Sequence, residues 1–368
     1  MEKIQLIFLV LLLMSLTCQS KNENQDHIIK HIEIYSSHDK YCAWPAMIRA
    51  ANGDLLVTFC INEEHLGPDG KIVMVRSSDN GESWSLPEII LDTPLDDRHA
   101  GLTLLRDGTI IAHCWTTFWT RQKYYDLPPN SYQAEMIERW SQHVEQSEYV
   151  EAEKLEGSWG FKNDDHGRTW TNPEFGKDSI HGGLQLVDGS LLVASYLLEK
   201  DYIGVYAAKS VNHPWEIIAN VNSAQPDSIR FGEPHILQLP SGRVIMMIRA
   251  TTKPYNDLDS RCFLYGTYSD DNGKSWAEPY QTPLWGYPPH LLQLSDGRIL
   301  APMAIAVTRL GNEPVSAKMA SHGKKRTNSF LWTMLLTRIW AILSRLSWSQ
   351  ERFSASIINL IRRMVTSG

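Results

Sequence analysis

The sequence predicts an all-β protein with the architecture of a β-propeller, and three observations support this. An eight-residue pattern with Asp, Gly and Trp at fixed positions occurs three times, beginning at Ser77, Asn163 and Ser269. A second repeat consists of an apolar run, a tight turn with glycine and another apolar run. Its spacing is close to fifty residues, the length expected when four short strands form each repeat.

Each copy of the eight-residue pattern has the features of a β-hairpin turn. In the first copy the Asp79 carboxylate can accept hydrogen bonds from turn N–H groups, Gly81 supplies a positive φ and Trp84 packs beneath the hairpin. The other copies place Asp165 and Asp271 at the same position. The sequence therefore predicts that these three aspartates lie on outer turns and have structural roles.

The turn glycines of the second repeat divide the chain into blades. Gly53 and Gly108 are 55 residues apart, and Gly242 and Gly297 are also 55 apart. Each turn is predicted to open one blade, so five blades are visible, and the eight-residue pattern closes the last hairpin of the first, second and fourth. The gap of 81 residues from Gly108 to Gly189 indicates an insertion in the second blade.

The insertion is predicted to contain a helix. Asn130 or Ser131 can cap it, and the helix then runs to about Gln146. Five aromatic residues precede it, either as a sugar-stacking platform or as a contact that packs the helix onto the propeller: Trp115, Phe118, Trp119, Tyr124 and Tyr125.

Residues 1–26 are predicted to be a signal and spacer that precede the propeller of residues 27–303. The apolar run Ile4–Leu16 is too short to span a bilayer as a mature helix and fits an export signal. Cys18 follows it and resembles the acylated cysteine of a bacterial lipoprotein, which would place the protein in the periplasm, on the outer membrane or at the cell surface through a lipid anchor. Ordinary secretion is the alternative.

The net charge and the spacing of the cysteines argue against some classes of partner and site. The net charge of −7 argues against a nucleic-acid partner. The other four cysteines are dispersed without C-x-x-C spacing, so we expect buried free thiols in place of a zinc or redox site.

The three copies of S/N-x-D-x-G-x-[ST]-W resemble the Asp box of the sialidase superfamily. That resemblance implies a six-bladed propeller that hydrolyses a terminal sugar of a glycan without a cofactor. Five blades are visible here, so the resemblance also implies that one is missing.

The resemblance extends to the stretch Phe231–His235 and the following hairpin. Sialidases have an inner-strand Glu followed one hairpin later by an Arg on the adjacent strand, and Glu233 and Arg249 match these positions. By resemblance Glu233 is the base partner of a Tyr nucleophile, and Arg249 binds the substrate carboxylate through its planar fork. The alternative is a buried ion pair across one hairpin.

Other positions depart from the family pattern. Ala43 stands where the first arginine of sialidases is found. Arg98 could substitute for that arginine, or could form a surface ion pair with Asp96 or Asp97. The tyrosine nucleophile should lie in the last two blades, and we do not assign Tyr287 to that role.

The acid/base residue of the family lies in the first-blade loop, where Asp69 is the matching candidate. Pro-Asp-Gly is also a plain turn signal, so a structural role is the alternative, and Glu64 is the reserve candidate.

Four histidines recur near the starts of the predicted inner strands: His99, His181, His235 and His290. Polar contacts to sugar hydroxyls are the favoured interpretation, with His235 and His290 as substrate-binding residues. A metal site formed by all four is the alternative, but no carboxylate spacing motif accompanies them.

The composition changes at about Ala304. Residues 304–368 contain no Asp or Tyr, and basic residues far outnumber the two glutamates. A basic amphipathic membrane helix over Phe330–Leu346 is one interpretation. We prefer the hypothesis of a single frameshift near Ala304. Plausible codons for this tail, read in another reading frame, can encode a strand, a Gly turn and a strand, which are the elements that the missing blade would require.

The sequence thus predicts a sialidase-like exo-glycoside hydrolase that removes sialic acid or a related terminal sugar. Loss of the last blade is expected to leave this chain inactive. A non-catalytic carbohydrate-binding propeller is the alternative function.

Overall fold

A computed structural model describes residues 32–63, 67, 69–117, 138–139, 142, 152–177, 179–196, 202–253, 263–284, 286, 288–303, 309–310 and 313–314. All of them belong to one compact unit, Ile32–Trp348. Cys18, Glu64, Tyr287 and nearly all of the tail after Ala304 lie outside the described residues. Three residues of the predicted helical insertion are described and are helical: Glu138, Arg139 and Gln142.

Four antiparallel sheets of four strands each make up most of the fold. The first contains β1 (Tyr41–Arg49), β2 (Leu55–Asn62), β3 (Lys71–Ser77) and β4 (Glu88–Leu91). The second contains β5 (Asp96–Leu104), β6 (Ile110–Thr117), β7 (Gly157–Asn163) and β8 (Glu174–Phe175). The third contains β9 (Leu184–Gln185), β10 (Leu191–Tyr196), β11 (Tyr202–Ala208) and β12 (Glu216–Asn222). The fourth contains β13 (Ile229–Gln238), β14 (Val244–Thr252), β15 (Tyr265–Ser269) and β16 (Tyr280–Gln281).

Three shorter elements complete the described secondary structure. A two-stranded hairpin follows the fourth sheet, formed by β17 (Leu292–Gln293) and β18 (Ile299–Leu300). A second hairpin is formed by β19 (Arg309–Leu310) and β20 (Glu313–Pro314), and a 3₁₀ helix covers Ala152–Leu155. Among the described residues, no helix reaches the length and hydropathy needed to cross a bilayer.

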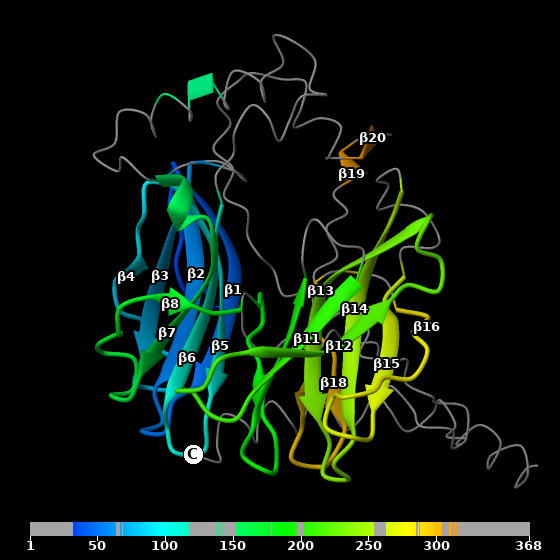
Figure 1. Ribbon diagram of the computed structural model, residues 1–368. Coiled ribbons are helices and arrows are strands. Elements are labelled where there is room, and N and C mark those ends of the chain that lie inside the picture. Colours follow the sequence, from blue (N-terminus) through cyan, green and yellow to red (C-terminus); the bar gives the residue numbers. More distant parts are fainter. Residues whose placement is uncertain are drawn as a thin grey trace, which may run out of the picture. The chain divides into compact units, whose positions relative to one another are not determined.

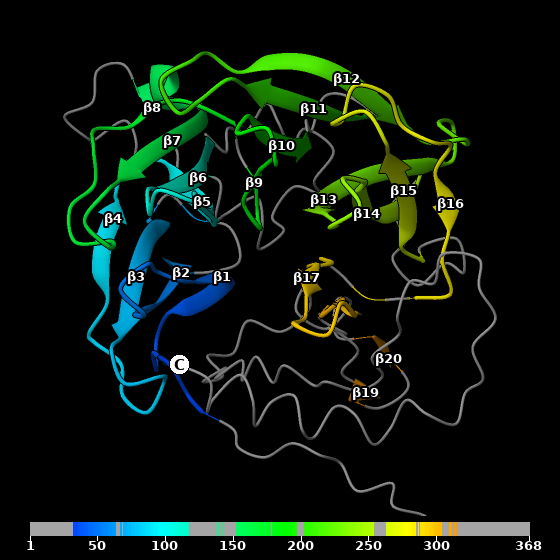
Figure 2. The ribbon, with the colours of Figure 1, turned by 90° about the horizontal axis from the view of Figure 1, so that it is seen from below.

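The sheets are the blades of a propeller (Figure 1). Figure 2 shows β1, β5, β9, β13 and β17 around a common centre, with β4, β8, β12 and β16 at the periphery. The predicted fold class is therefore confirmed. The sequence predicted five blades, whereas the described residues form four complete blades and the opening hairpin of a fifth.

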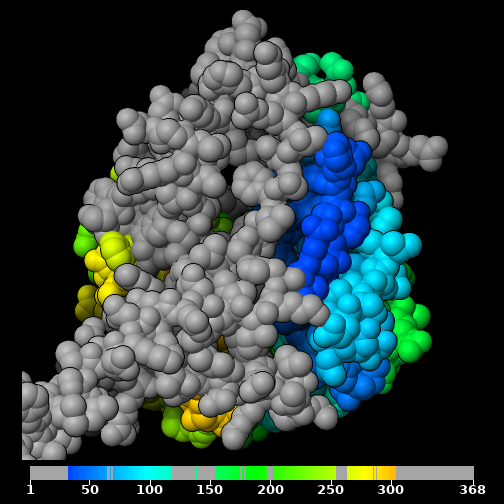
Figure 3. Space-filling model, turned by 180° about the vertical axis from the view of Figure 1, so that it is seen from behind, coloured from blue at the N-terminus to red at the C-terminus, as the bar shows by residue number. Residues whose placement is uncertain are grey.

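Contacts between neighbouring blades form the core. Phe231 is fully buried in a cluster shared by the third and fourth blades, and its ring centroid lies 5.0 Å from that of Tyr265. Leu56, Ile72 and Ile110 belong to an equivalent cluster between the first and second blades. Because both faces of the middle strands are covered, β2 and β10 are almost continuously buried, whereas the outermost strand β12 is largely exposed. Figure 3 shows the first blade, in blue and cyan, at the surface when seen from behind.

The eight-residue repeats form the hairpin turns between the third and fourth strands of the first, second and fourth blades, as predicted. The Asp79 carboxylate accepts bonds from the Ser83 hydroxyl and backbone N–H, which holds the pKa of Asp79 well below its usual value. Trp84 donates its indole N–H to the Gly81 carbonyl at 3.2 Å. Asn80 precedes Gly81 with φ of 60°, so each turn contains two consecutive left-handed residues where the sequence indicated one.

The described cysteines are free thiols, as expected. Cys60 and Cys114 are buried, and Cys42 is partly buried. Burial raises the pKa of Cys60 to about 12, so this thiol is protonated at neutral pH.

Candidate functional site

Three of the innermost strands carry the same β-bulge near their starts. The pairing register slips between Ala43 and Ala46 in β1, between Arg98 and Gly101 in β5, and between Gly232 and His235 in β13. The first residue inside each bulge has a left-handed backbone conformation, with φ of 53° at Trp44, 56° at His99 and 45° at Glu233. A non-glycine residue with positive φ is uncommon, and bulges re-aim side chains near functional sites. These three positions therefore mark the candidate site.

Glu233 and Arg249 form an ion pair across one hairpin of the fourth blade. Arg249 Nη1 donates to Glu233 Oε1 at 2.8 Å, and the side chains are only 16% and 19% exposed for Arg249 and Glu233. Gly232 lies opposite Arg249 in the strand pairing, so the bulge turns Glu233 toward its partner. Glu233 Oε2 is buried and has no hydrogen-bond partner among the described residues. The pair thus keeps one buried carboxylate oxygen available as an acceptor.

Tyr196, at the end of β10, also belongs to this neighbourhood. A Cβ atom built on Gly232 would lie 3.5 Å from the Tyr196 ring, an ordinary van der Waals distance, so the ring lies beside the strand that carries Glu233. Sequence reasoning missed Tyr196, because it comes from the third blade and has no motif around it.

His181, His235 and His290 come together from three successive blades. The His235 and His290 rings are stacked with centroids 4.2 Å apart, and the His181 centroid lies 5.2 Å from His235 and 5.1 Å from His290. His235 Nδ1 accepts the Leu291 N–H at 2.7 Å, so the proton of the neutral His235 ring lies on Nε2. His181 Nε2 is buried without a hydrogen-bond partner among the described residues.

Burial lowers the pKa of each member of this cluster. It lowers the pKa of His290 to about 4, and burial together with the neighbouring histidines holds those of His181 and His235 well below the usual value. The rings are therefore neutral at pH 7 and offer neutral hydrogen-bonding groups. In the part of the chain that the structure describes, no group of three or more His, Cys, Asp or Glu residues has the geometry to hold a metal ion.

Arg98 is held in a buried ion pair with Asp96. Its Nη1 donates to Asp96 Oδ2 at 2.9 Å, with side chains 5% and 0% exposed for Arg98 and Asp96. The guanidinium also lies over the Trp44 ring, 4.0 Å from its centroid. One alternative for Arg98 was a surface ion pair with Asp96 or Asp97. The partner is Asp96, but the pair is buried because Trp44 covers it.

Asp97 is a buried carboxyl that sequence reasoning did not single out as a site residue. It accepts bonds from the Thr93 backbone and the Thr116 hydroxyl, both at 2.6 Å. Burial raises the pKa of Asp97 to about 7.

Asp69 lies in the first-blade loop and engages both of its oxygens. Lys40 Nζ donates to Oδ2 at 2.8 Å, and the Glu63 backbone N–H donates to Oδ1 at 2.9 Å. The side chain is 28% exposed. This geometry suits the turn role, and the acid/base role stays a prediction.

A row of half-buried aromatic rings runs across the first two blades. The centroid of Trp44 lies 5.8 Å from that of Tyr41 and 5.7 Å from that of His99, and His99 lies 5.9 Å from Trp115. We call these four residues the aromatic wall. Sequence reasoning named Trp115 and His99 as candidates but missed Tyr41 and Trp44. One feature of the sequence could have identified Trp44. It lies nine residues before Gly53, and the same spacing separates Glu233 from Gly242.

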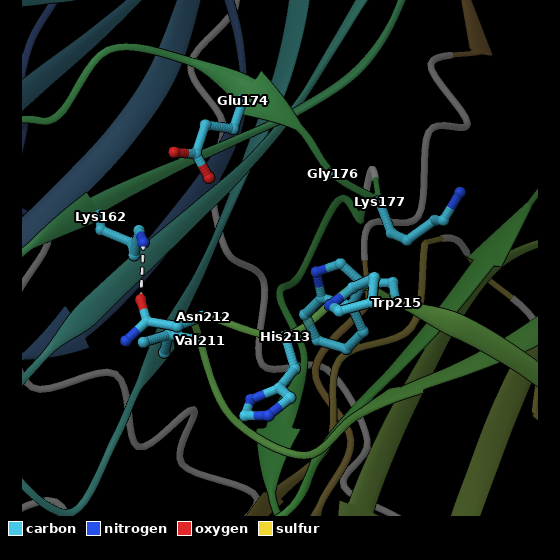
Figure 4. A pocket seen from close by; sticks show the side chains of 9 residues that line it. Lys162, Glu174, Gly176, Lys177, Val211, Asn212, His213 and Trp215 are labelled. Atoms are coloured by element: carbon cyan, nitrogen blue, oxygen red, sulfur yellow. Dashed lines mark hydrogen bonds between the residues drawn. The ribbon is translucent and has the colours of Figure 1, made fainter.

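A separate cavity of about 470 Å³ lies between β7, β8 and the loop that precedes β12 (Figure 4). Lys162 lines it and donates to Asn212 Oδ1 at 3.0 Å, while Lys177 Nζ lies 4.5 Å from the centroid of the Tyr206 ring. None of the predicted site residues lines this cavity.

No protein-family model matches the chain, and no curated protein sequence matches it. Solved structures do match. A protein of unknown function from Dyadobacter fermentans is 18% identical with a TM-score of 0.60, and the match covers 76% of this chain and 79% of that one. The NanB sialidase of Streptococcus pneumoniae is 13% identical with a TM-score of 0.53, over 76% of this chain and 59% of the sialidase.

The chain has the sialidase-type propeller fold. An α-L-arabinanase from Penicillium chrysogenum is also similar, at 14% identity and a TM-score of 0.50, over 77% of this chain and 83% of that one. The fold is thus shared with glycoside hydrolases that act on different sugars, and these identities show the fold alone.

Proposed function

We propose that this chain descends from, or is, an exo-acting glycoside hydrolase that releases a terminal sugar, sialic acid or a related one, from a glycan. One observation carries the proposal. Glu233 sits on a left-handed bulge of an innermost strand, paired with Arg249, and its Oε2 is buried without a partner among the described residues. Likeness to sialidase and arabinanase propellers supports the same class of chemistry.

The pair is chemically suited to this reaction. A carboxylate with an unengaged oxygen can accept the proton of a hydroxyl group, either on the substrate or on an attacking residue. The Arg249 guanidinium offsets the charge of the Glu233 carboxylate, and Nη1, which bonds Glu233, is one of several N–H donors that a guanidinium carries.

A second candidate function is carbohydrate binding without hydrolysis. Both oxygens of Asp69 are already engaged, which weakens its claim to an acid/base role. Ala43 also leaves the first blade without the arginine found at that place in sialidases.

Turnover of a panel of fluorogenic glycosides, including a sialoside, tests the proposal. The assay is run on the 368-residue chain and on a second version, in which the reading frame of the gene is changed after about Ala304 to reverse the proposed frameshift. Glu233→Gln should lower the rate by roughly 100-fold or more, because general-base catalysis contributes that much. Glu216→Gln, on the exposed end of β12, is the matched control and should leave the rate unchanged.

The outcomes separate the two functions. Hydrolysis that is lost in Glu233→Gln supports the enzyme. Glycan binding with no hydrolysis by either version supports the binding protein. Neither binding nor hydrolysis would refute both.

A further inference from the structure

We infer that the sugar recognised at this site is uncharged, and that it stacks on the aromatic wall formed by Tyr41, Trp44, His99 and Trp115. This inference rests on the proposed function, because it assumes that the site around Glu233 binds a glycan. It narrows the terminal sugar to a neutral one and so departs from the sialic acid that the proposed function also allows, a choice that neither the fold nor the similar structures decide.

The aromatic wall belongs to the same level of the propeller as Glu233. Trp44, His99 and Glu233 occupy the same bulge position on three innermost strands, each nine residues before its turn glycine. The strands that carry them, β1, β5 and β13, surround a common centre (Figure 2), and His181 contacts His235 on the strand of Glu233. The bulge residues therefore surround one axis.

The wall presents aromatic faces in several orientations. Its four rings come from β1, β5 and β6, follow one another at 5.7–5.9 Å, are inclined to one another by 61°, 79° and 31°, and remain partly exposed. Trp44 is held from beneath by the Arg98 guanidinium at 4.0 Å, which fixes the ring in place. A rigid aromatic surface suits the apolar C–H face of a sugar ring.

Among the described residues, three cations near the site are paired with carboxylates. Arg249 is paired with Glu233 at 2.8 Å, and Arg98 with Asp96 at 2.9 Å. Lys40 is paired with Asp69 at 2.8 Å. Arg230, three residues before Glu233 on β13, also has interaction partners.

The positive charge of each arginine is therefore already balanced by its partner, so the carboxylate of an acidic sugar would add a negative charge with no counter-charge of its own, even where it reached the remaining N–H donors. Breaking either arginine pair would leave Glu233 or Asp96 as a buried carboxylate without its counter-charge, which is strongly unfavourable. A neutral sugar meets no such obstacle. Glu233 Oε2 and His181 Nε2 are buried without hydrogen-bond partners among the described residues, and a sugar hydroxyl group that reached them would satisfy each.

A glycan array probed with the 368-residue chain tests the inference. The array carries glycans ending in neutral hexoses, pentoses, deoxyhexoses and N-acetylhexosamines, and glycans ending in sialic or uronic acids. We expect binding to neutral termini only. Binding confined to acidic termini would overturn the inference while leaving the proposed function intact, and no binding to any glycan would overturn both.

Variants then test the stacking surface on the best neutral glycan. Trp44→Ala should weaken binding roughly tenfold, which corresponds to about 1.4 kcal/mol, and Trp44→Phe should restore most of the affinity. Trp84→Phe, in an outer hairpin turn, is the matched control and should bind as the wild type does. Unchanged binding in a folded Trp44→Ala would refute the stacking role.

Salt provides a readout that does not depend on a variant. Recognition of a neutral sugar should be nearly independent of ionic strength between about 0.05 and 0.5 M salt, because no ion pair forms on binding. A marked loss of affinity over this range would point to an acidic ligand and overturn the inference.

Discussion

Acid should weaken the propeller through the histidines that join its third, fourth and fifth blades. The His290 ring is stacked on His235 and contacts His181, and burial lowers the pKa of His290 to about 4. The unfolded chain binds a proton on this residue below about pH 6.5, whereas the folded chain does so only near pH 4. The stability contributed by neutral His290 is therefore complete above pH 6.5 and is lost as the pH falls toward 4.

The magnitude follows from the two pKa values. Between about pH 8 and pH 4.5, a histidine with these pKa values removes about 2.5 kcal/mol from the free energy of unfolding. His181 and His235 act in the same direction, because their pKa values are lowered too.

Urea unfolding followed by tryptophan fluorescence at the two pH values measures this loss. His290→Gln should show a smaller loss than the wild type by about 2.5 kcal/mol, because glutamine does not titrate. His38→Gln, at an exposed position, is the control and should match the wild type. The reasoning is refuted if wild type and His290→Gln lose the same stability between the two pH values.

Four further measurements test the fold and the chain. Asp165→Ala should lower the free energy of unfolding by about 1–2 kcal/mol through lost turn bonds, whereas the adjacent exposed Asp164→Ala should leave it unchanged; equal effects would contradict the turn role. Because burial raises the pKa of Asp97 to about 7, the folded state keeps a proton that the unfolded state releases, so the contribution of Asp97 opposes that of the histidines and is lost as the pH rises from about 4 to 7; over this range the wild type should lose stability relative to Asp97→Asn. Phe231→Ala should cost about 3–5 kcal/mol in urea unfolding, since the ring is fully buried, and a loss below about 1 kcal/mol would mean that the cluster between the blades is not the core. If the tail after about Ala304 arose from a frameshift, restoring the reading frame there should improve solubility and permit hydrolysis, and vigorous sialoside hydrolysis by the unrepaired chain would show that its catalytic residues all precede that point.

Much of the fold was readable from local patterns. The Asp, Gly and Trp of each turn repeat interact within a few residues of one another, as the bond from Trp276 to the Gly273 carbonyl illustrates. Adjacency within one hairpin also brought Glu233 and Arg249 together, because the turn at Gly242 sets which residues of β13 and β14 face each other. The bulge that gives Glu233 its positive φ was not readable, since a bulge depends on the pairing of both strands.

The sequence by itself thus determined the fold class, the turn chemistry and the Glu233–Arg249 pairing, all of which rest on short-range spacing. Only the tertiary structure decided that His181, His235 and His290 meet, and that Trp44 covers the buried pair of Arg98 with Asp96. These contacts join residues of different blades. Their geometry depends on how the sheets pack around the axis, and no spacing along the chain encodes that packing.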